Sequence, residues 1–565
     1  MPATDLDCLF IHAPKAEGHY LPFGDFMNIT YMPMGLLAIA EWLRRQGRRV
    51  ELVHLGVEWV EDPNYRVVDA YDGRAIRAIG LSLYWHYQSY DAIEVARALK
   101  AAHPESFVFL GGLTSGYFAE QLIAEYPFID GVLQGHAEAA SQHLIDTLTS
   151  GGDLTRVPHL VHRAASGTVI VNDRDHAGRL LQGGPGIDDL IFGDLSVMQH
   201  PHTYANSFGF PLAYGREFTR AENRKMLTMG RAFFPLFIGR GCAYTCTFCG
   251  GNRDTLRKVN GTSKLLWRSQ DSVVADIRRA MEFGYKTMAL CYDPTPTKDE
   301  YYVELFRRIR AEGLDVDFYF ECWGLPTPRF VAEFKQTFPS PESYIAISPD
   351  AGDDEVRRKN KQPFYTTAQL FETLDLLEAS EVTFDVFYTI ALPGETVATA
   401  RTTQEQINTI AARYKRARRL MTWSVQLEPG SPQFERPEAF SMITDRHRFS
   451  DFHAAHGGNR SDTYSSLGFK LAGYFGDERD VGGIAEFEHH LQHLKCMEFC
   501  FLGRDPRFWA SPSAGRQHCF ERRSLLADRR GIPAPSRPIG EGWTYRDALA
   551  EEDAHRGARA RATWV

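Results

Sequence analysis

The sequence predicts an α/β protein: a doubly wound, Rossmann-like sheet, then a partial (β/α)6 barrel, then a mixed C-terminal region. Two observations support this fold class. Short apolar runs alternate with amphipathic helical segments in two long stretches, as they do in parallel sheets covered by helices. The 565 residues are also enough for about two to four domains. The expected parts are a sheet domain, a connector, the barrel, a C-terminal pocket region and a peripheral tail, at residues 1–150, 151–232, 233–431, 432–520 and 521–565.

In the first domain, apolar runs and helical periodicity alternate strictly along the chain. Strands are expected at Leu6–His12, Arg49–Leu55, Ala75–Leu83, Phe107–Leu110 and Ile129–Leu133. Between them, helices are expected at Met34–Gln46, Asp91–Ala102, Ala119–Glu125 and Ala137–Leu148.

Small residues follow these strands, where open α/β sheets bind their ligands. They fall in the segments Gly80–Ser82, Gly111–Ser115 and Gly131–Gly135. Glycine lets a ligand approach the backbone closely, although the same glycines could simply turn strands into helices. No G-x-G-x-x-G sequence is present, which disfavours a nicotinamide or flavin dinucleotide.

The connector and the barrel follow. Val157–Asn172 is β-like, Arg220–Gly230 is a helix candidate, and Asp188–Leu190 could dock the connector or could be plain linker. Six strand and helix units then predict a partial barrel whose site lies at the carboxyl ends of the strands. The expected strands are Phe234–Gly239, Thr287–Tyr292, Asp317–Glu321, Tyr344–Ser348, Phe384–Ala391 and Met421–Leu427.

Three cysteines after the first barrel strand form the most specific motif. Cys242, Cys246 and Cys249 have the spacing C-x₃-C-x₂-C, and no fourth cysteine is nearby. Three thiolates can hold three irons of a four-iron cluster and leave the fourth iron open to a small molecule. Zinc is the alternative, but structural zinc generally takes four protein ligands.

This run, with Phe248 before the last cysteine and Gly250-Gly251 after it, resembles the radical S-adenosylmethionine (SAM) superfamily signature. The first domain resembles the cobalamin-binding domain of the cobalamin-dependent (class B) members, so the resemblance covers nearly all of residues 1–510. It implies three cofactors, namely a 4Fe-4S cluster, SAM and cobalamin. The D-x-H-x-x-G motif is absent, so no axial histidine is expected from it.

The resemblance also implies cofactor contacts. On the cobalamin side, Gly135–Glu138 resembles the family's Gly-Glu-Gly-Glu with two departures. Gly250 and Gly251 would face the methionyl amino group of SAM, Ser348 and Asp350 its ribose, and Pro393 its adenine. The candidates for cobalamin are Ser82, Gly111, Gly112, Ser115, Gly135 and Glu138.

Three polar residues at strand ends are candidates for chemistry. Glu321 could accept a hydrogen bond from SAM or substrate, and Tyr292 and Asp293 face the same expected cavity. Satisfied turns, helix caps or a buried tyrosine are the alternative for each. Arg268 is expected to have a structural or phosphate-contacting role rather than a catalytic one.

The C-terminal region is expected to close the barrel and shape the substrate pocket. His489, His490 and His493 have spacing that suits a metal, but a solvated helix face is favoured. Cys496, Cys500 and Cys519 are interpreted as buried structural thiols rather than ligands of a second cluster.

Composition indicates the partners. The net charge of −9 comes without a long basic block, which argues against nucleic acid. The chain lacks signal-peptide features and any run of about 18 apolar residues, so a cytoplasmic protein with no membrane partner is expected. Nine cysteines in a chain of this length disfavour a disulfide framework. We expect a monomer that takes electrons from an external donor such as flavodoxin or ferredoxin.

The resemblance implies a C-methyltransferase. The enzyme would transfer a methyl group from SAM through methylcobalamin to an unactivated carbon of a small natural-product precursor, as in antibiotic biosynthesis. The first alternative keeps both cofactors but performs an oxidation, ring contraction or cyclisation, and a second transfers methyl without a radical. A cluster-binding scaffold without catalysis would need four protein ligands.

Overall fold

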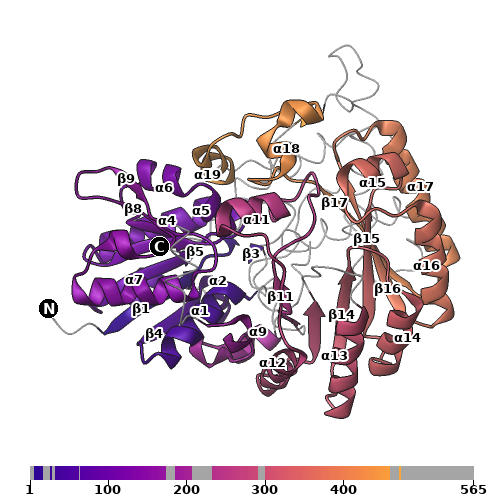
Figure 1. Cartoon of the computed structure of the whole chain (residues 1–565), viewed down its shortest axis with the longest axis horizontal. Coiled ribbons are helices and arrows are strands. Elements are labelled where there is room, and N and C mark those ends of the chain that lie inside the picture. Colours follow the sequence, from indigo (N-terminus) through magenta and orange to yellow (C-terminus); the bar gives the residue numbers. More distant parts are fainter. Residues whose placement is uncertain are drawn as a thin grey trace, which may run out of the picture.

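The computed structural model is an α/β structure with two large sheets and describes residues 5–16, 26–27, 32–62, 64–173, 185–206, 232–290, 299–457 and 470–471. One sheet lies in the N-terminal part of the chain and the other in the barrel (Figure 1). The predicted fold class is therefore confirmed.

The first sheet has the strand order β4-β1-β5-β6-β7-β8-β9, with its first five strands parallel. This is the 2-1-3-4-5 order of one common doubly wound fold. The main helices of this part are α1 (Met34–Arg45), α2 (Leu55–Glu61), α4 (Ser89–Ala102), α5 (Leu113–Tyr117), α6 (Ala119–Glu125) and α7 (Glu138–Ser150). The parallel strands are β1 (Leu6–His12), β4 (Val50–His54), β5 (Ile76–Ser82), β6 (Phe107–Gly111) and β7 (Gly131–Leu133), so each expected strand is confirmed within two residues at either end.

The first sheet continues beyond residue 150, where the sequence places the end of the domain. The β-like stretch forms β8 (Leu160–Arg163) and β9 (Val169–Val171), and both add antiparallel to the sheet beside β7. These residues are therefore part of the first sheet rather than of a plain connector.

The second sheet has six parallel strands in sequence order, which is the arrangement expected for a partial barrel. The helices between and after them include α12 (Gln270–Glu282), α13 (Asp299–Ala311), α14 (Pro328–Thr337), α15 (Asp354–Asn360), α16 (Thr367–Ala379) and α17 (Val397–Arg413). The strands are β10 (Phe233–Pro235), β13 (Thr287–Leu290), β14 (Asp317–Cys322), β15 (Tyr344–Asp350), β16 (Thr383–Ile390) and β17 (Ala417–Ser424).

The first barrel strand is shorter than expected. The predicted run Phe234–Gly239 divides into β10 and a separate strand β11 (Gly239–Arg240), which pairs antiparallel with β12 (Leu266–Trp267). The chain therefore leaves the barrel sheet just before the cysteine loop.

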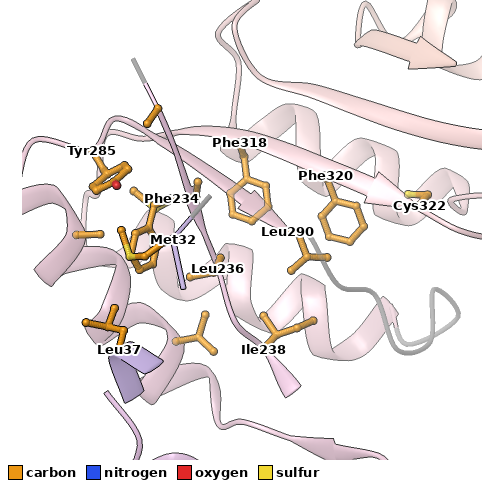
Figure 2. Packing of buried hydrophobic residues seen from close by; sticks show 14 of the residues in the cluster. Met32, Leu37, Phe234, Leu236, Ile238, Tyr285, Leu290, Phe318, Phe320 and Cys322 are labelled. Atoms are coloured by element: carbon orange, nitrogen blue, oxygen red, sulfur yellow. The ribbon is translucent and has the colours of Figure 1, made fainter. Parts of the chain in front are cut away.

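One continuous apolar core joins the two sheets. Figure 2 shows Met32 and Leu37 of the first domain lying beside Phe234 and Leu236 from the start of the barrel. All of these side chains are buried. Burying apolar area between domains stabilises their docking by about 25 cal/mol per Å².

The connector docks through one buried arginine. Arg268 pairs with Asp276 at 2.8 Å, and both side chains are 1% exposed. The Arg268 guanidinium also donates to the carbonyl oxygens of Phe237 and Leu190, and the Asp188 carboxylate accepts from the Ser269 amide at 2.7 Å. The docking role considered for Asp188–Leu190 and the structural role of Arg268 are therefore both observed.

The C-terminal region is described only in part. It contains α18 (Pro432–Glu435), β18 (Met442–Ile443), α19 (Phe449–Gly457) and β19 (Lys470–Leu471). Helix α19 packs against α4 of the first domain. The segment Arg220–Gly230, the histidines His489, His490 and His493 and the cysteines Cys496, Cys500 and Cys519 lie outside the described residues.

Candidate functional site

The cysteine loop lies between β11 and α11 (Arg253–Asn260). Gly241 begins it at φ +93°, and a Cβ there would lie 2.5 Å from the Lys264 carbonyl oxygen, so only glycine fits. Cys242 is buried, while Cys246 and Cys249 are partly buried. None of the described cysteines forms a disulfide.

Two cap interactions fix the end of the loop. Asn252 begins α11, and its side chain accepts from the amides of Asp254 and Thr255, a regular N-cap. Its amide nitrogen donates to the carbonyl oxygens of Cys249 at 2.6 Å and Gly430 at 3.0 Å. The last cysteine is therefore tied both to the helix that follows it and to the segment after β17.

The three thiols lie in surroundings that favour their neutral form. Burial raises the pKa of each, and the charges of the other cysteines add to the effect at Cys242 and Cys249. A thiol in such surroundings needs a cation or a metal to become a stable thiolate. Within the described residues, no group of three or more histidine, cysteine or acidic side chains is arranged to hold a single metal ion. Three free thiols on one short loop fit an iron-sulfur cluster, which spreads its ligands over several irons.

A partly buried carboxylate lies against Gly250, the residue that follows Cys249. The Glu428 Oε2 atom accepts from the Gly250 amide at 2.6 Å. Burial raises the pKa of Glu428 to about 7, although the Gly250 hydrogen bond acts to lower it. A Cβ on Gly250 would lie 2.7 Å from the Pro429 carbonyl oxygen, so this glycine allows a close approach of two backbones.

Polar groups gather at the carboxyl ends of β14 and β15. The Glu321 carboxylate accepts from the Tyr319 hydroxyl at 3.0 Å and from the Ser348 hydroxyl at 3.5 Å. Burial raises the pKa of Glu321, while its hydrogen bond from Tyr319 and the nearby Lys361 charge act in the opposite direction. Asp350 pairs with Lys361 at 2.8 Å. Glu321, Ser348 and Asp350 are thus brought together as the sequence predicts.

The turn after β16 is held internally. The Glu395 carboxylate accepts from the amides of Ala391 at 2.6 Å and Leu392 at 3.3 Å. The Pro393 carbonyl oxygen accepts from the Asn360 side chain at 2.8 Å. Pro393 is therefore fixed against the last residue of α15.

On the first domain, the backbone at the ends of β5 and β6 is shaped by glycine. Gly112 has φ +120°, and a Cβ there would lie 2.6 Å from the Leu83 carbonyl oxygen, whereas a Cβ on Gly111 would meet nothing within 4 Å. The Ser115 hydroxyl donates to the Gly112 carbonyl oxygen at 3.1 Å and is buried. Open space at Gly111, beside a tightly packed Gly112, fits a ligand that lies on this edge.

Tyr84, just after β5, reaches toward the cysteine loop. It is 45% exposed, yet burial raises its pKa to about 12 with further contributions from the charges of Cys249 and Glu428. The next residue, Trp85, is 38% exposed and packs edge to face on Tyr84.

Two candidates on the first domain lie at the domain contact. A Cβ on Gly135 would lie 3.0 Å from Asn260 Cα. Glu138 forms a buried ion pair with Arg240 of β11. Burial would raise the pKa of Glu138, but the Arg240 guanidinium outweighs burial and the net pKa is lowered. The Glu138 carboxylate therefore joins the two domains in this structure.

Sequence reasoning missed Lys361, Glu428, Tyr84 and Asn360. Asn360 is the last residue of α15, and Lys361 follows it. Their role appears only when this end of the helix folds over the cysteine loop. An isolated lysine or glutamate in a loop carries no periodic or spacing signal. Tyr292 and Asp293 lie outside the described residues.

Comparison with known proteins agrees with this site. The B12 binding domain family matches residues 29–145, and the Radical SAM superfamily matches residues 236–407. A hopanoid C-3 methylase of Methylococcus capsulatus is 24% identical over 352 residues, which are 62% of this chain and 59% of the relative. An uncharacterized methyltransferase of Pyrococcus horikoshii is 24% identical over 229 residues, covering 40% of this chain and 42% of the relative. The matched segments thus span about half the length of these curated relatives.

Two solved structures share the fold. The radical SAM methyltransferase TsrM of Kitasatospora setae, with cobalamin and a 4Fe-4S cluster bound, superposes with a TM-score of 0.60 at 14% identity, covering 93% of this chain and 99% of that one. The cobalamin-dependent SAM radical enzyme OxsB, with aqua-cobalamin and SAM bound, gives 0.55 at 12% identity, covering 96% and 78%.

The chain thus joins an N-terminal B12-binding domain to a radical SAM domain. This pair of domains is the one that defines cobalamin-dependent radical SAM enzymes, and the two matched domains imply cobalamin, SAM and a 4Fe-4S cluster as cofactors. Among the described residues, no helix is both long and apolar enough to cross a membrane.

Proposed function

We propose that this enzyme is a C-methyltransferase, moving a methyl group from SAM to an unactivated carbon of a small natural-product precursor. The observation that carries the proposal is the meeting of two ligand-binding edges. A Cβ on Gly251, in the cysteine loop, would lie 3.7 Å from Cys249 Sγ and 3.9 Å from Leu113 Cδ2 at the carboxyl edge of the first sheet. Tyr84, on the same edge, has its pKa raised in part by the charges of Cys249 and Glu428 on the barrel side. Helices α5 and α11 pack together beside them, with a Cβ on Gly116 reaching Val259 Cγ1 at 2.7 Å.

Each side of this junction has its own holding residues. Cys242, Cys246 and Cys249 would ligate the cluster, and Gly250 and Gly251 would receive the methionyl group. Ser348, Asp350 and Pro393 would line the rest of the SAM site. Bound together, the cluster and SAM supply hydrogen-atom abstraction, and cobalamin supplies methyl transfer. The residues for cobalamin would be Ser82, Gly111, Gly112, Ser115 and Gly135.

The side chains between the edges would handle protons and exclude water. Glu321 is held by Tyr319 and Ser348, and burial raises its pKa, which makes it a candidate for proton transfer. Tyr84 and Trp85, which pack edge to face just after β5, would keep water from the reacting carbon. Tyr292 and Asp293 stay candidates for substrate contacts. Glu138 would support the site by holding the two domains together.

The names of the relatives favour carbon methylation over the alternatives. One is a hopanoid C-3 methylase, whose name specifies a carbon position. The alternative is a non-methylating oxidation, ring contraction or cyclisation with the same cofactors, and the radical enzyme OxsB shares the fold.

Product analysis separates these reactions. Anaerobically reconstituted enzyme with SAM, cobalamin, reductant and candidate precursors should give 5′-deoxyadenosine together with a product carrying an added methyl group. Deoxyadenosine with an unmethylated, altered product would favour the alternative. A methylated product without deoxyadenosine would indicate methyl transfer without a radical.

The proposal also covers the substrate, the localisation, the oligomeric state and the electron donor. The substrate would be a precursor in antibiotic biosynthesis, and the enzyme would be a cytoplasmic monomer that receives electrons from flavodoxin or ferredoxin. The net charge of −9 supports a small-molecule partner rather than nucleic acid. Light scattering of the purified protein tests the monomer, and turnover with each electron donor in place of dithionite tests the partner.

A further inference from the structure

Three consecutive residues, Asn360, Lys361 and Gln362, hold the middle of the cysteine loop, and we call them the 360–362 clamp. The Asn360 carbonyl oxygen accepts from the Thr247 amide at 3.0 Å. The Gln362 Oε1 atom accepts from the Thr245 amide at 3.1 Å. The Gln362 amide donates to the Cys246 sulfur at 3.3 Å. The clamp thus contacts the residues on both sides of Cys246 and the sulfur itself.

The same clamp is anchored to the barrel strands. The Asn360 side chain donates to the Pro393 carbonyl oxygen at 2.8 Å, beyond the end of β16. Lys361 is 4% exposed, and its Nζ lies 2.8 Å from Asp350 Oδ2 at the end of β15. The other Asp350 oxygen accepts from the Thr389 hydroxyl at 2.8 Å. A buried ion pair is therefore fixed next to the cysteine loop.

Both charges of this pair lie next to a cluster ligand. Lys361 directly precedes Gln362, whose amide contacts Cys246 Sγ at 3.3 Å, and Asp350 is held against Lys361 at 2.8 Å. Charges in a protein interior interact more strongly than in water. Hydrogen bonds to the sulfurs and nearby net charge are two of the factors that set the potential of an iron-sulfur cluster.

We propose that the 360–362 clamp sets the reduction potential of the cluster, with Lys361 raising it and Asp350 lowering it. The inference rests on the proposed function in that the three cysteines must hold the cluster. The 4Fe-4S cluster would accept one electron from an external reductant, and its cysteine ligands would stay bound in both oxidation states. A positive charge stabilises the reduced, more negative cluster, so the lysine favours reduction. Asp350 offsets that effect and keeps the reduced cluster a strong donor.

The test measures midpoint potentials rather than turnover. The full chain is reconstituted with iron and sulfide, and the 4Fe-4S couple is titrated with dithionite under EPR in the absence of SAM. We expect a lower midpoint for Lys361→Met and a higher midpoint for Asp350→Asn. The double variant should return close to wild type, and Lys361→Arg, which keeps the charge, should stay there. Lys359→Met is the matched control, because that lysine is two residues away and exposed.

Each outcome decides one question. If cluster-loaded Lys361→Met and Asp350→Asn both keep the wild-type midpoint, or both shift it in the same direction, the clamp would be overturned. If Lys361→Met does not fold, the other two variants still decide the question. The midpoint should rise in Asp350→Asn and return close to wild type in the double variant. A wild-type chain that assembles no cluster would overturn the proposed function and the clamp with it.

Discussion

The ion pair between Glu138 and Arg240 gives the sharpest stability prediction, because it joins the N-terminus of α7 to strand β11 before the cysteine loop. The side chains are 7% and 15% exposed, so both charges are largely out of water. Removing one partner of such a pair leaves the other charge buried and costs roughly 3–5 kcal/mol. Glu138→Ala should therefore lower the free energy of unfolding by about 3–5 kcal/mol at pH 7.

The size of the effect can be assigned by a double-mutant cycle. Arg240→Met should also destabilise, but the double variant should lose much less than the sum, because no uncompensated charge remains. The assay is urea unfolding of the reduced protein followed by circular dichroism. Additive losses in the double variant would refute the assignment of a coupled pair.

The same pair should produce an acid dependence. The pKa of Glu138 is lowered in the folded protein, so its stabilising contribution is complete above the unfolded value of about 4.3. The contribution is lost as the pH falls through the lower folded pKa. Wild type should therefore lose stability in that acid range more steeply than Glu138→Gln. Equal slopes would contradict the pairing.

Three further predictions concern residues that hold the backbone around the site. Gly112→Ala should cost at least about 1–3 kcal/mol and weaken cobalamin uptake, because its φ is +120° and its Cβ would meet the Leu83 carbonyl oxygen. Gly35→Ala, with open space in helix α1, should reduce neither stability nor uptake. Arg268→Met leaves the buried Asp276 carboxylate without its closest cation, so the free energy of unfolding measured in urea should fall by roughly 3–5 kcal/mol. A loss of less than about 1 kcal/mol would contradict the role of Arg268 in docking. Asn252→Ala removes an N-cap and the link to the Cys249 carbonyl, so iron content after reconstitution should fall along with about 1 kcal/mol of stability; unchanged iron would contradict the link.

Much of the fold could be predicted from the chain because the strands are strongly patterned. The runs from Leu6 and from Phe107 are apolar, short and followed by amphipathic helices, so they have few alternatives. The cysteine spacing likewise predicts an iron-sulfur cluster from a short stretch of sequence alone. Strand β10 was predicted too long because the apolar run continues through Ile238, while the chain turns to pair with β12.

The missed part of the site depends on contacts between distant segments. Lys361 and Cys246 are brought together only when the end of α15 folds over the cysteine loop, and Glu428 reaches Gly250 from beyond β17. Glu138 looks like a ligand contact in the sequence, but the structure pairs it with Arg240 from another domain. No local periodicity encodes such pairs.

The central claim is that the two cofactor edges meet at Tyr84 and Cys249, and the magnetic interaction between the cofactors tests it most directly. Enzyme loaded with cobalamin and cluster would be reduced so that cob(II)alamin and the reduced 4Fe-4S cluster are both paramagnetic, and its EPR spectrum recorded. The account predicts that the cob(II)alamin signal is split or broadened by the cluster, and that this disappears when the three cysteines are replaced by alanine. A spectrum equal to the sum of the two isolated signals would contradict it.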